Sequence, residues 1–462
     1  MNRDLRASAL RPWLAFLTCA IVLSFAVQRA EVLRAATLHE RVLYAFRGGT
    51  DGKYPYGSLL ADSRGALYGT TINGGTTACG YANGCGTIFK LIRSKAGYVE
   101  RVIHRFGFVN DGSLPDAGLI VDSRGVLYGT TGRGGTGPCE GPANGCGTVF
   151  KLTPTRSGYS ETRLYDFRGG ADGMIPTSTL VMDENGSLFG TTIGGGSATG
   201  CIAYAGYCGV VFELTPSGSG YRETVLHRFQ GGSDGADPSA GVVLGAGGAL
   251  YGTTVEGGSG TDCGSLGCGT VFELKPTARG YTERVIHTFG SMSGGQYPSA
   301  PLFVDAAGAL YGTTRSGGGE NCARIYDNAC GVVFKLTPKE SGYAFAVVHR
   351  FSNGERDGGR PFAALLQEED GVLYGTTFTG GGGSCPAFGS SEGCGTAYEL
   401  APAGSGYAES LLYRFQLADG GDYPAANLIA DRHGVLYGTA THGGDMRRCQ
   451  QTGLGVVFAL TP

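Results

Sequence analysis

The sequence predicts an all-β fold, a seven-bladed β-propeller with four antiparallel strands in each blade. A Leu-Tyr-Gly-Thr-Thr segment or a close variant recurs seven times at intervals of 60–63 residues. Its aromatic residues are Tyr68, Tyr128, Phe189, Tyr251, Tyr311, Tyr374 and Tyr437. A period of this length suits four short strands and is too long for most helical solenoids. In addition, residues 40–46 repeat the pattern of residues 100–106, so the N-terminal strand can complete the last blade.

Composition excludes several other classes of protein. The 462 residues include 85 Gly and 18 Pro, a glycine share well above the usual level of about 7%. The chain still has no Gly-X-Y period, and Gly and Pro together stay below the level typical of low-complexity disorder. The formal net charge is −3 with 16% charged residues, so we expect no nucleic-acid partner and no acidic tail. The hydrophobic content of 41% is ample for a large core.

The first 36 residues differ from the rest and predict an export signal. Arg3, Arg6 and Arg11 precede an apolar run over residues 12–27. As a helix this run spans about 24 Å, short of a hydrocarbon core of about 30 Å, which favours a signal peptide over a retained hydrophobic anchor. We therefore divide the chain into a signal or N-terminal hydrophobic segment, 1–36, and a propeller, 37–462. The mature chain is expected to be extracytoplasmic and to lack a membrane span.

Each repeat unit predicts strands A to D. In the first unit these are residues 58–62, 66–71, 86–91 and 98–106, which are rich in β-branched and aromatic residues and bounded by turn formers. A tight Asp-x-x-Gly turn joins A to B in several units, and we interpret its Asp as structural. Radial closure leaves few free sheet edges, which favours a propeller. We expect residues 40–46 to pair with residues 455–460, order to begin near Leu38, and loss of the N-terminal strand to open the ring.

The combined motifs resemble those of a known bacterial repeat family. Each unit carries versions of Asp-Gly-x-x-Pro, Asp-x-x-Gly-x-Leu-Tyr-Gly-Thr-Thr, Gly-Gly and Cys-Gly-Thr-Val-Phe-Lys-Leu-Thr-Pro. Over residues 39–462 this is similar to the GloVer-type tandem-repeat proteins. The resemblance implies an exported, propeller-shaped protein from a family that often carries C-terminal anchors, which this sequence does not show. It implies no established activity and no catalytic residues.

Cysteines recur as one pair per unit in the B-to-C connection. The pairs are Cys79/Cys85, Cys139/Cys146, Cys201/Cys208, Cys263/Cys268, Cys322/Cys330 and Cys385/Cys394. We interpret them as local disulfides, because an exported chain meets an oxidising compartment. Zinc would need four converging ligands, and each unit offers two thiols without a Cys-x-x-Cys spacing, so we predict no metal. Unit seven has Cys449 but Leu454 where its partner would lie. This leaves Cys449 as a free thiol or a link between molecules of an otherwise monomeric protein.

Two variable columns of aligned residues mark a candidate binding surface. In a propeller with this strand order the long B-to-C and D-to-A connections share one face, and binding residues tend to lie on loops held by a rigid frame. The first column follows strand B: Asn73, Arg133, Gly194, Glu256, Ser316, Thr379 and His442. The second follows the loop proline: Tyr56, Asp116, Thr177, Ser239, Ser299, Phe362 and Ala425. Weakly constrained, solvated loops would also explain such variation. The residue after the second column is always small, which indicates crowding near the axis.

Other polar positions are expected to be structural. Strand D carries an aligned His or Tyr in every unit: Tyr44, His104, Tyr165, His227, His287, His349 and Tyr413. An Asp precedes Gly in most D-to-A loops: Asp51, Asp111, Asp172, Asp234, Asp357 and Asp419. Turn formation explains these aspartates, although calcium coordination remains open. Unit five has Gly294 instead.

The sequence contains no nucleophile elbow, zinc-protease motif or phosphate-binding loop. We therefore predict no catalytic residue and no cofactor. The leading hypothesis is an extracytoplasmic propeller that binds a protein or glycan through its loop-rich face. This hypothesis rests partly on fold analogy. The alternatives are a carbohydrate-active lyase or hydrolase with its site at the channel mouth, and a structural component of the cell envelope.

Overall fold

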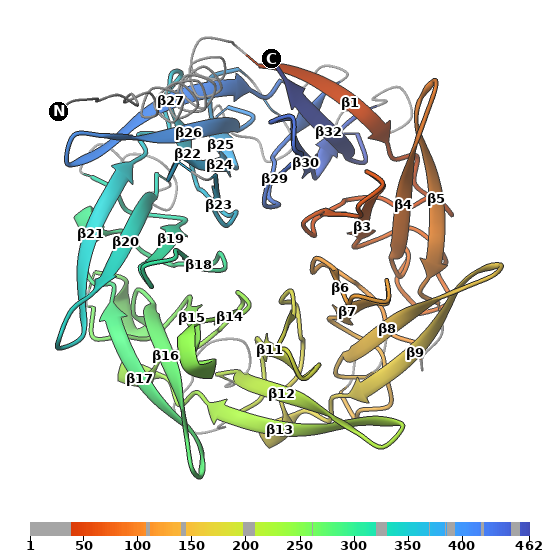
Figure 1. Ribbon diagram of the computed structural model, residues 1–462, viewed down its shortest axis with the longest axis horizontal. Helices are drawn as coiled ribbons and strands as arrows, with labels where there is room; N and C mark the ends of the chain where they lie inside the picture. The colour runs from red at the N-terminus through yellow and green to blue at the C-terminus, as the bar shows by residue number, and fades with distance from the viewer. Residues whose placement is uncertain are drawn as a thin grey trace, which may run out of the picture.

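Seven four-stranded antiparallel sheets surround a common axis within the described residues, which confirms the predicted propeller (Figure 1). The computed structural model describes residues 38–107, 111–139, 145–196, 208–260, 262–319, 330–368, 370–383, 385, 393–416, 420–444 and 453–462. In these stretches no helix has the length and apolar character that crossing a bilayer requires. Among the described residues, four 3-10 turns lie in the D-to-A or B-to-C connections, and a fifth, η4 (Ala246–Gly248), forms an A-to-B turn. The four are η1 (Gly170–Asp172), η3 (Gly232–Asp234), η5 (Gly264–Leu266) and η6 (Met292–Gly294).

The A and B strands form the inner half of each blade. The A strands lie closest to the axis (Figure 1) and contain two residues each. They are β2 (Leu60–Ala61), β6 (Ile120–Val121), β10 (Val181–Met182), β14 (Val243–Leu244), β18 (Phe303–Val304), β23 (Leu366–Gln367) and β29 (Ile429–Ala430). The B strands are β3 (Leu67–Thr71), β7 (Leu127–Thr131), β11 (Leu188–Thr192), β15 (Leu250–Thr254), β19 (Leu310–Thr314), β24 (Leu373–Thr377) and β30 (Leu436–Ala440). Every B strand coincides with the repeated motif.

The C and D strands form the longer outer half. The C strands are β4 (Thr87–Ser94), β8 (Thr148–Thr155), β12 (Val210–Ser217), β16 (Thr270–Thr277), β20 (Val332–Pro338), β26 (Thr396–Ala403) and β32 (Val456–Thr461). The D strands are β5 (Gly97–Arg105), β9 (Gly158–Asp166), β13 (Gly220–Arg228), β17 (Gly280–Thr288), β21 (Tyr343–Arg350), β27 (Gly406–Arg414) and, for blade seven, β1 (His39–Ala45). Two small ladders pair β22 (Gly358–Gly359) with β25 (Thr379–Gly380) and β28 (Gly421–Asp422) with β31 (His442–Gly443).

Packing explains the repeated motif residue by residue. A Cβ atom on Gly69 would lie 2.5 Å from the ring of Phe89 on strand C, so only glycine fits there. The Thr70 hydroxyl donates to the carbonyl of Ala117 in the next blade at 2.9 Å. The Thr71 hydroxyl instead bonds within its own blade, to the carbonyl two residues further on. One threonine therefore joins blades while its neighbour fixes the end of the strand.

Two strand boundaries differ from the prediction. Strand A of blade one has two residues rather than the five of 58–62, and strand C continues to Ser94 rather than ending at 91. In blade two the repeated proline, Pro154, lies inside strand C and pairs with Tyr159. The pairing of strand C with strand B already ends two residues before Pro154, where Leu127 lies opposite Leu152. The missing N–H of Pro154 therefore faces no strand, which is why proline is tolerated there.

The core lies between neighbouring blades. One buried cluster joins Ile88 and Phe106 of blade one to Phe150 of blade two. The rings of Phe106 and Phe150 meet edge to face with centroids 5.2 Å apart. The same contact closes the ring, where Phe46, which follows β1, meets Phe89 of blade one at 5.1 Å. Aromatic pairs of this geometry stabilise the fold by more than the area they bury accounts for. The stability of each blade therefore depends on its neighbours.

The N-terminal strand completes blade seven as predicted. Strand β1 pairs with β32 from His39 opposite Thr461 to Ala45 opposite Val456, and the sheet order is β1-β32-β30-β29. Outside this ladder, the N–H of Leu38 donates to the Leu412 carbonyl at 3.2 Å. The ring is thus closed by pairing segments from both ends of the described chain.

Candidate binding site

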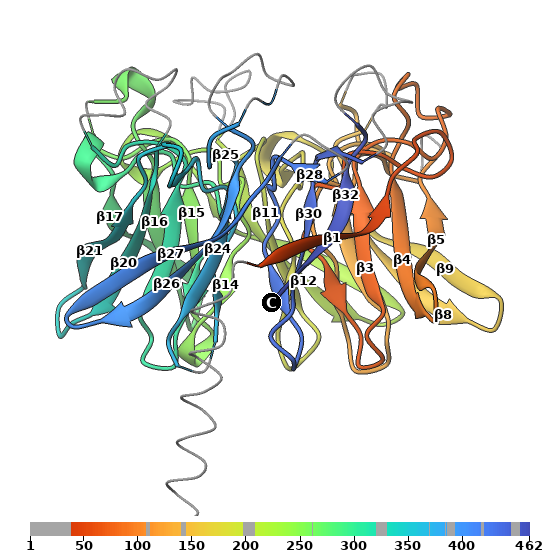
Figure 2. The ribbon, with the colours of Figure 1, turned by 90° about the horizontal axis from the view of Figure 1, so that it is seen from above.

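The long connections gather on one face of the ring, which we call the loop face. Figure 2 shows β25 and β28, which belong to these connections, at the upper edge, whereas the hairpins between strands C and D, such as the one joining β8 to β9, point to the lower edge. The D-to-A connection leads from the outermost to the innermost strand. Its last residues therefore lie near the axis, at what we call the inner rim of the loop face.

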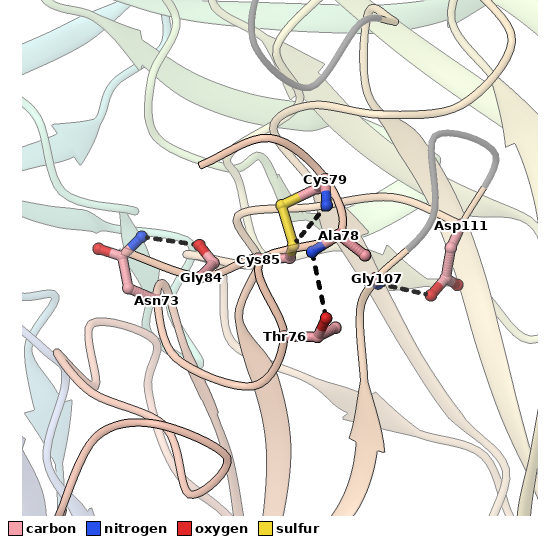
Figure 3. Close-up of a disulfide and its surroundings, with 8 residues drawn as sticks. All are labelled: Asn73, Thr76, Ala78, Cys79, Gly84, Cys85, Gly107 and Asp111. Carbon is pink, nitrogen blue, oxygen red and sulfur yellow. Dashed lines mark hydrogen bonds between the residues drawn. A yellow bond between two sulfur atoms is a disulfide. The ribbon is translucent and has the colours of Figure 1, made fainter. Parts of the chain in front are cut away.

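Four of the predicted disulfides form in the described residues. They join Cys79 to Cys85, Cys139 to Cys146, Cys263 to Cys268 and Cys385 to Cys394. Cys208 and Cys330 are also disulfide-bonded. Their predicted partners, Cys201 and Cys322, lie outside the described residues, as does Cys449. Figure 3 shows the first bridge, with the Thr76 hydroxyl accepting from the N–H of Ala78 at 3.1 Å beside it.

The stapled loops hold the next blade in place. The carbonyl of Cys85 accepts the N–H of Leu114, which precedes the loop proline of blade two, at 2.8 Å. Gly86 packs against Pro115 so closely that a Cβ would have no room. Equivalent bonds recur around the ring, and in the last one Leu454 takes the cysteine's place and accepts from Tyr54 at 2.8 Å. The Cys-Gly and x-Pro motifs are therefore two halves of one contact between blades.

This contact forces an unusual backbone conformation. The residue before the loop proline has a positive φ, between 53° and 61°, in all seven blades, and none of the seven is glycine. They are Tyr54, Leu114, Ile175, Asp237, Tyr297, Arg360 and Tyr423. Both the side chain and the following proline disfavour such a conformation, so the hydrogen bond to the preceding blade holds it. These residues form a third variable column at the inner rim, which the sequence analysis missed.

Some residues of the first predicted column support the loops through hydrogen bonds, and others lie at the inner rim. Asn73 donates to the Gly84 carbonyl of its own loop at 3.2 Å (Figure 3). Thr379 donates to the Asn353 side chain at 2.8 Å, and Ser316 is buried. The backbone of Arg133 bridges to Ser113. Of the remaining three, Gly194 bridges to Met174 through its backbone, and Glu256 and His442 belong to the clusters described below.

Aromatic side chains line the rim over blades six, seven and one, and we call them the aromatic segment. Phe362 and Phe378 meet at 5.2 Å, and Phe378 meets Tyr423 at 4.9 Å across the border between blades six and seven. His442 then contacts Tyr423 at 5.7 Å and Tyr54 of blade one at 5.4 Å. Tyr423 is fully buried and the other four are partly exposed. The segment thus offers ring faces on a rigid base.

Blades four and five carry a charged segment made of Asp237, Glu256, Tyr297 and Arg315. The Arg315 guanidinium lies 4.9 Å from the centre of the Tyr297 ring. Burial and, secondarily, the Glu256 charge raise the pKa of Asp237 to about 7, and Arg315 opposes this shift. Burial also raises the pKa of Glu256, again opposed by Arg315. One oxygen of Asp237 is buried without a hydrogen bond. The segment therefore holds two carboxyl groups and one guanidinium.

Tyr56 and Asp116, from the second column, lie together between these segments. Tyr56 is 43% exposed. Its pKa is raised by desolvation and by the Asp116 charge, and lowered by Arg315 of blade five. Burial raises the pKa of Asp116 to about 7, and one of its oxygens has no hydrogen bond. The charges of Asp116 and Arg315, from blades two and five, therefore both act at Tyr56 of blade one.

The small residues after the second column are needed where blades cross. A Cβ on Gly57 would lie 2.5 Å from the Ala117 carbonyl oxygen. The carbonyls of the six other members each accept a threonine hydroxyl from the preceding blade, as Ser178 does from Thr130 at 3.2 Å. All seven are Gly57, Ala117, Ser178, Ala240, Ala300, Ala363 and Ala426. The expected crowding is present.

The His and Tyr residues of strand D form latches with the loop aspartates. Tyr44 donates to Asp51 at 2.8 Å and Tyr165 to Asp172 at 2.6 Å, while His227 lies 3.1 Å from Asp234. In unit five, where Gly294 replaces the Asp, His287 stacks on Phe345 of the next blade at 4.0 Å. Asp419 lies outside the described residues, and Tyr413 instead donates to Glu40 at 3.0 Å.

One latch also has the composition of a metal site. Among the described residues, the donor atoms of His227, Asp234 and Glu283 all lie within 4.8 Å of one another. Tyr44 and Tyr165 occupy the histidine position in other blades and hydrogen-bond to their aspartates. Because the latch forms with either tyrosine or histidine at this position, we interpret it as a hydrogen-bonded contact between blades.

Comparisons with known proteins agree with this architecture. The model of the Gloeobacter/Verrucomicrobia repeat family matches residues 32–204, 139–388 and 326–462. No curated protein matches the chain. Among solved structures, a copper-bound fungal alcohol oxidase of the AA5 family is similar with 15% identity and a TM-score of 0.50, covering 92% of this chain and 77% of its own. A PL25 ulvan lyase has 9% identity and a TM-score of 0.48, covering 86% and 90%. At such identities the likeness concerns the fold alone.

Proposed function

This chain belongs to the Gloeobacter/Verrucomicrobia repeat family, and we propose that it is an extracytoplasmic propeller that binds a glycan at the inner rim of its loop face. The rigid ring, stapled by disulfides, supports a binding role. Disulfides also indicate an oxidising compartment. An export signal over residues 1–36 would bring the chain there.

The observation that carries this proposal is the pairing of two unlike surfaces at the rim. The aromatic segment offers ring faces such as Phe378, on which the apolar face of a sugar can pack. The charged segment offers Glu256 and Arg315, which can bind hydroxyl groups. Both segments are held by the contact between the stapled loop and the next blade. Binding a ligand there therefore costs little conformational entropy of the protein.

A glycan array with the full-length exported protein tests the proposal. We expect Phe378→Ala and Arg315→Ala to weaken binding by about tenfold each, since each removes a contact worth roughly 1–2 kcal/mol. Arg279→Ala, on an exposed hairpin of the opposite face, is the matched control. Failure of every glycan to bind, with capture of a protein partner that Arg315→Ala abolishes, would replace the glycan with a protein ligand.

One observation favours a second candidate function, a carbohydrate-active lyase or hydrolase. Asp237 and Glu256 are close enough for the charge of one to raise the pKa of the other, and Arg315 and Tyr297 lie beside them. A carboxyl group with a pKa of about 7, as at Asp237, suits proton transfer at neutral pH. Turnover of a polysaccharide panel that is lost in Asp237→Asn but retained in Arg279→Ala would establish this activity.

A further inference from the structure

A hollow of about 450 Å³ lies where the ring closes, on the face opposite to the loop face. It is bounded by the A-to-B turn of blade seven, by β1, and by the hairpin between strands C and D of blade one. Arg41 belongs to β1, Arg93 and Lys95 to the hairpin, and Tyr98 and Tyr437 to neighbouring strands. We call this the closure pocket.

The closure pocket exists because one side chain is short. Ala459 of β32 pairs with Tyr437 on one side and with Arg41 on the other, and it is 3% exposed. The other six blades carry a long charged residue at this position: Lys90, Lys151, Glu213, Glu273, Lys335 and Glu399. Replacing such a side chain by a methyl group leaves its volume open.

Blade four shows what normally fills this space. Glu273 accepts the Tyr251 hydroxyl at 3.1 Å and pairs with Arg284 at 2.8 Å. Arg41 occupies the register position of Arg284, opposite Ala459 instead of a glutamate. Among the described ion pairs none includes Arg41, Arg93 or Lys95. The guanidinium of Arg41 thus lacks the carboxylate that its counterpart has.

A second departure from the repeat adds another cation. Arg93 pairs with Tyr98, at the position where blades two to six have a proline in strand C. The nearby acid, Asp431, is already engaged, because it accepts the N–H groups of His433 and Val435 and the hydroxyl of Tyr437. The closure pocket therefore has three cationic side chains and one hydrogen-bonded carboxylate.

We propose that the closure pocket binds a small anionic ligand, a sugar-sized molecule bearing a carboxylate, sulfate or phosphate group. Arginine guanidinium groups bind such anions through paired hydrogen bonds, and a pocket of this volume suits a small molecule. Tyr98 and Leu43 offer apolar surface for the body of the ligand. The proposal is independent of glycan binding at the inner rim, which lies on the other face.

Calorimetric titration of the full chain with a matched set of ligands tests this proposal. The set contains a uronic-acid disaccharide, a sulfated disaccharide, a sugar phosphate, the neutral parent disaccharide and inorganic phosphate. We expect at least one anionic sugar to bind, the neutral parent not to bind, and Arg93→Ala to weaken binding by about tenfold or more, the equivalent of one charge-assisted hydrogen bond. Which anionic member binds identifies the anionic group, and binding of inorganic phosphate alone would overturn the requirement for a sugar body.

Ala459→Glu is the decisive variant. It restores the side chain that blade four has, so it should fold normally, pair with Arg41 and abolish binding by filling the space. Arg156→Ala, in the exposed equivalent hairpin of blade two, should leave binding unchanged. Failure of every anionic sugar to bind, or binding that survives Ala459→Glu in a folded protein, would overturn the proposal.

Discussion

At Gly69 the ring of Phe89 occupies the space where a Cβ atom would stand, and the φ angle of this glycine is not in the left-handed region. The requirement is therefore steric and does not come from backbone freedom. The same contact recurs in blade two, where a Cβ on Gly129 would lie 2.7 Å from the ring of Phe150. The glycine of the repeat therefore leaves room for an aromatic ring of strand C to pack closely against strand B.

We expect Gly69→Ala to destabilise the protein by about 1–3 kcal/mol, the usual cost of overpacking a core position. Gly220→Ala is the control, because a Cβ there would meet nothing within 4 Å and its φ is not positive. Urea unfolding of both variants measures the difference. Equal midpoints for the two would show that the close contact with Phe89 does not constrain this position.

Neighbouring blades are also coupled by glutamates on strand D, which lie against the latch of the preceding blade. Glu100, Glu161, Glu223 and Glu283 each have one buried oxygen without a hydrogen bond. Burial, together with the charge of an aspartate of the latch, raises the pKa of each to about 7. In blade five Phe345 replaces the glutamate where Gly294 replaces the aspartate, so both carboxyl groups are lost together.

The raised pKa values of these glutamates predict that the free energy of unfolding falls as pH rises. A carboxyl group whose pKa is about 7 when folded and 4.5 ordinarily binds more protons in the folded state between those values. Its contribution is therefore present below pH 4.5 and lost as pH rises through 7. We expect Glu283→Gln to stabilise the protein at pH 8, with a smaller effect at pH 5, because the amide cannot become charged in a buried position beside Asp234.

Thermal unfolding of Glu283→Gln at pH 5 and pH 8 measures this effect. Glu184→Gln, on an exposed turn, is the matched control and should shift the unfolding temperature equally at both values. A Glu283→Gln protein that is less stable than the parent at pH 8 would mean that the ionised glutamate makes a favourable contact in the latch.

At the scale of the whole molecule, the ring and its closure could be predicted because they follow from a period visible in the sequence. The match between residues 40–46 and 100–106 was enough to place β1 in blade seven. The stapled loops could be predicted in the same way, from the pairing of cysteines within each unit.

The inner rim could be predicted only in part. Glu256, His442, Tyr56, Asp116 and Phe362 were found as variable columns. The residues before the proline were missed, because local preference argues against a positive φ at Tyr423 or Asp237, and only the hydrogen bond from the neighbouring blade explains it. Arg315 was missed because its importance comes from residues of other blades that it faces, which no single repeat reveals.

Ring closure is open to a direct test by truncation. Deletion of residues 1–46, behind an unrelated export signal, removes β1 and leaves the edge of β32 unpaired. Leu38 and Phe46 are 1% and 2% exposed, so their loss alone removes about 3–6 kcal/mol of hydrophobic stabilisation. Tyr413 and the N–H of Gly421 also lose their acceptor, Glu40.

We therefore expect the 1–46 deletion to unfold at a lower urea concentration than a 1–36 deletion, which keeps β1 intact. A synthetic peptide of residues 38–46 should restore the midpoint in a concentration-dependent way, because a free strand edge accepts a matching strand. Equal midpoints for the two deletions would show that contacts between blades, rather than the pairing of β1 with β32, hold the ring closed.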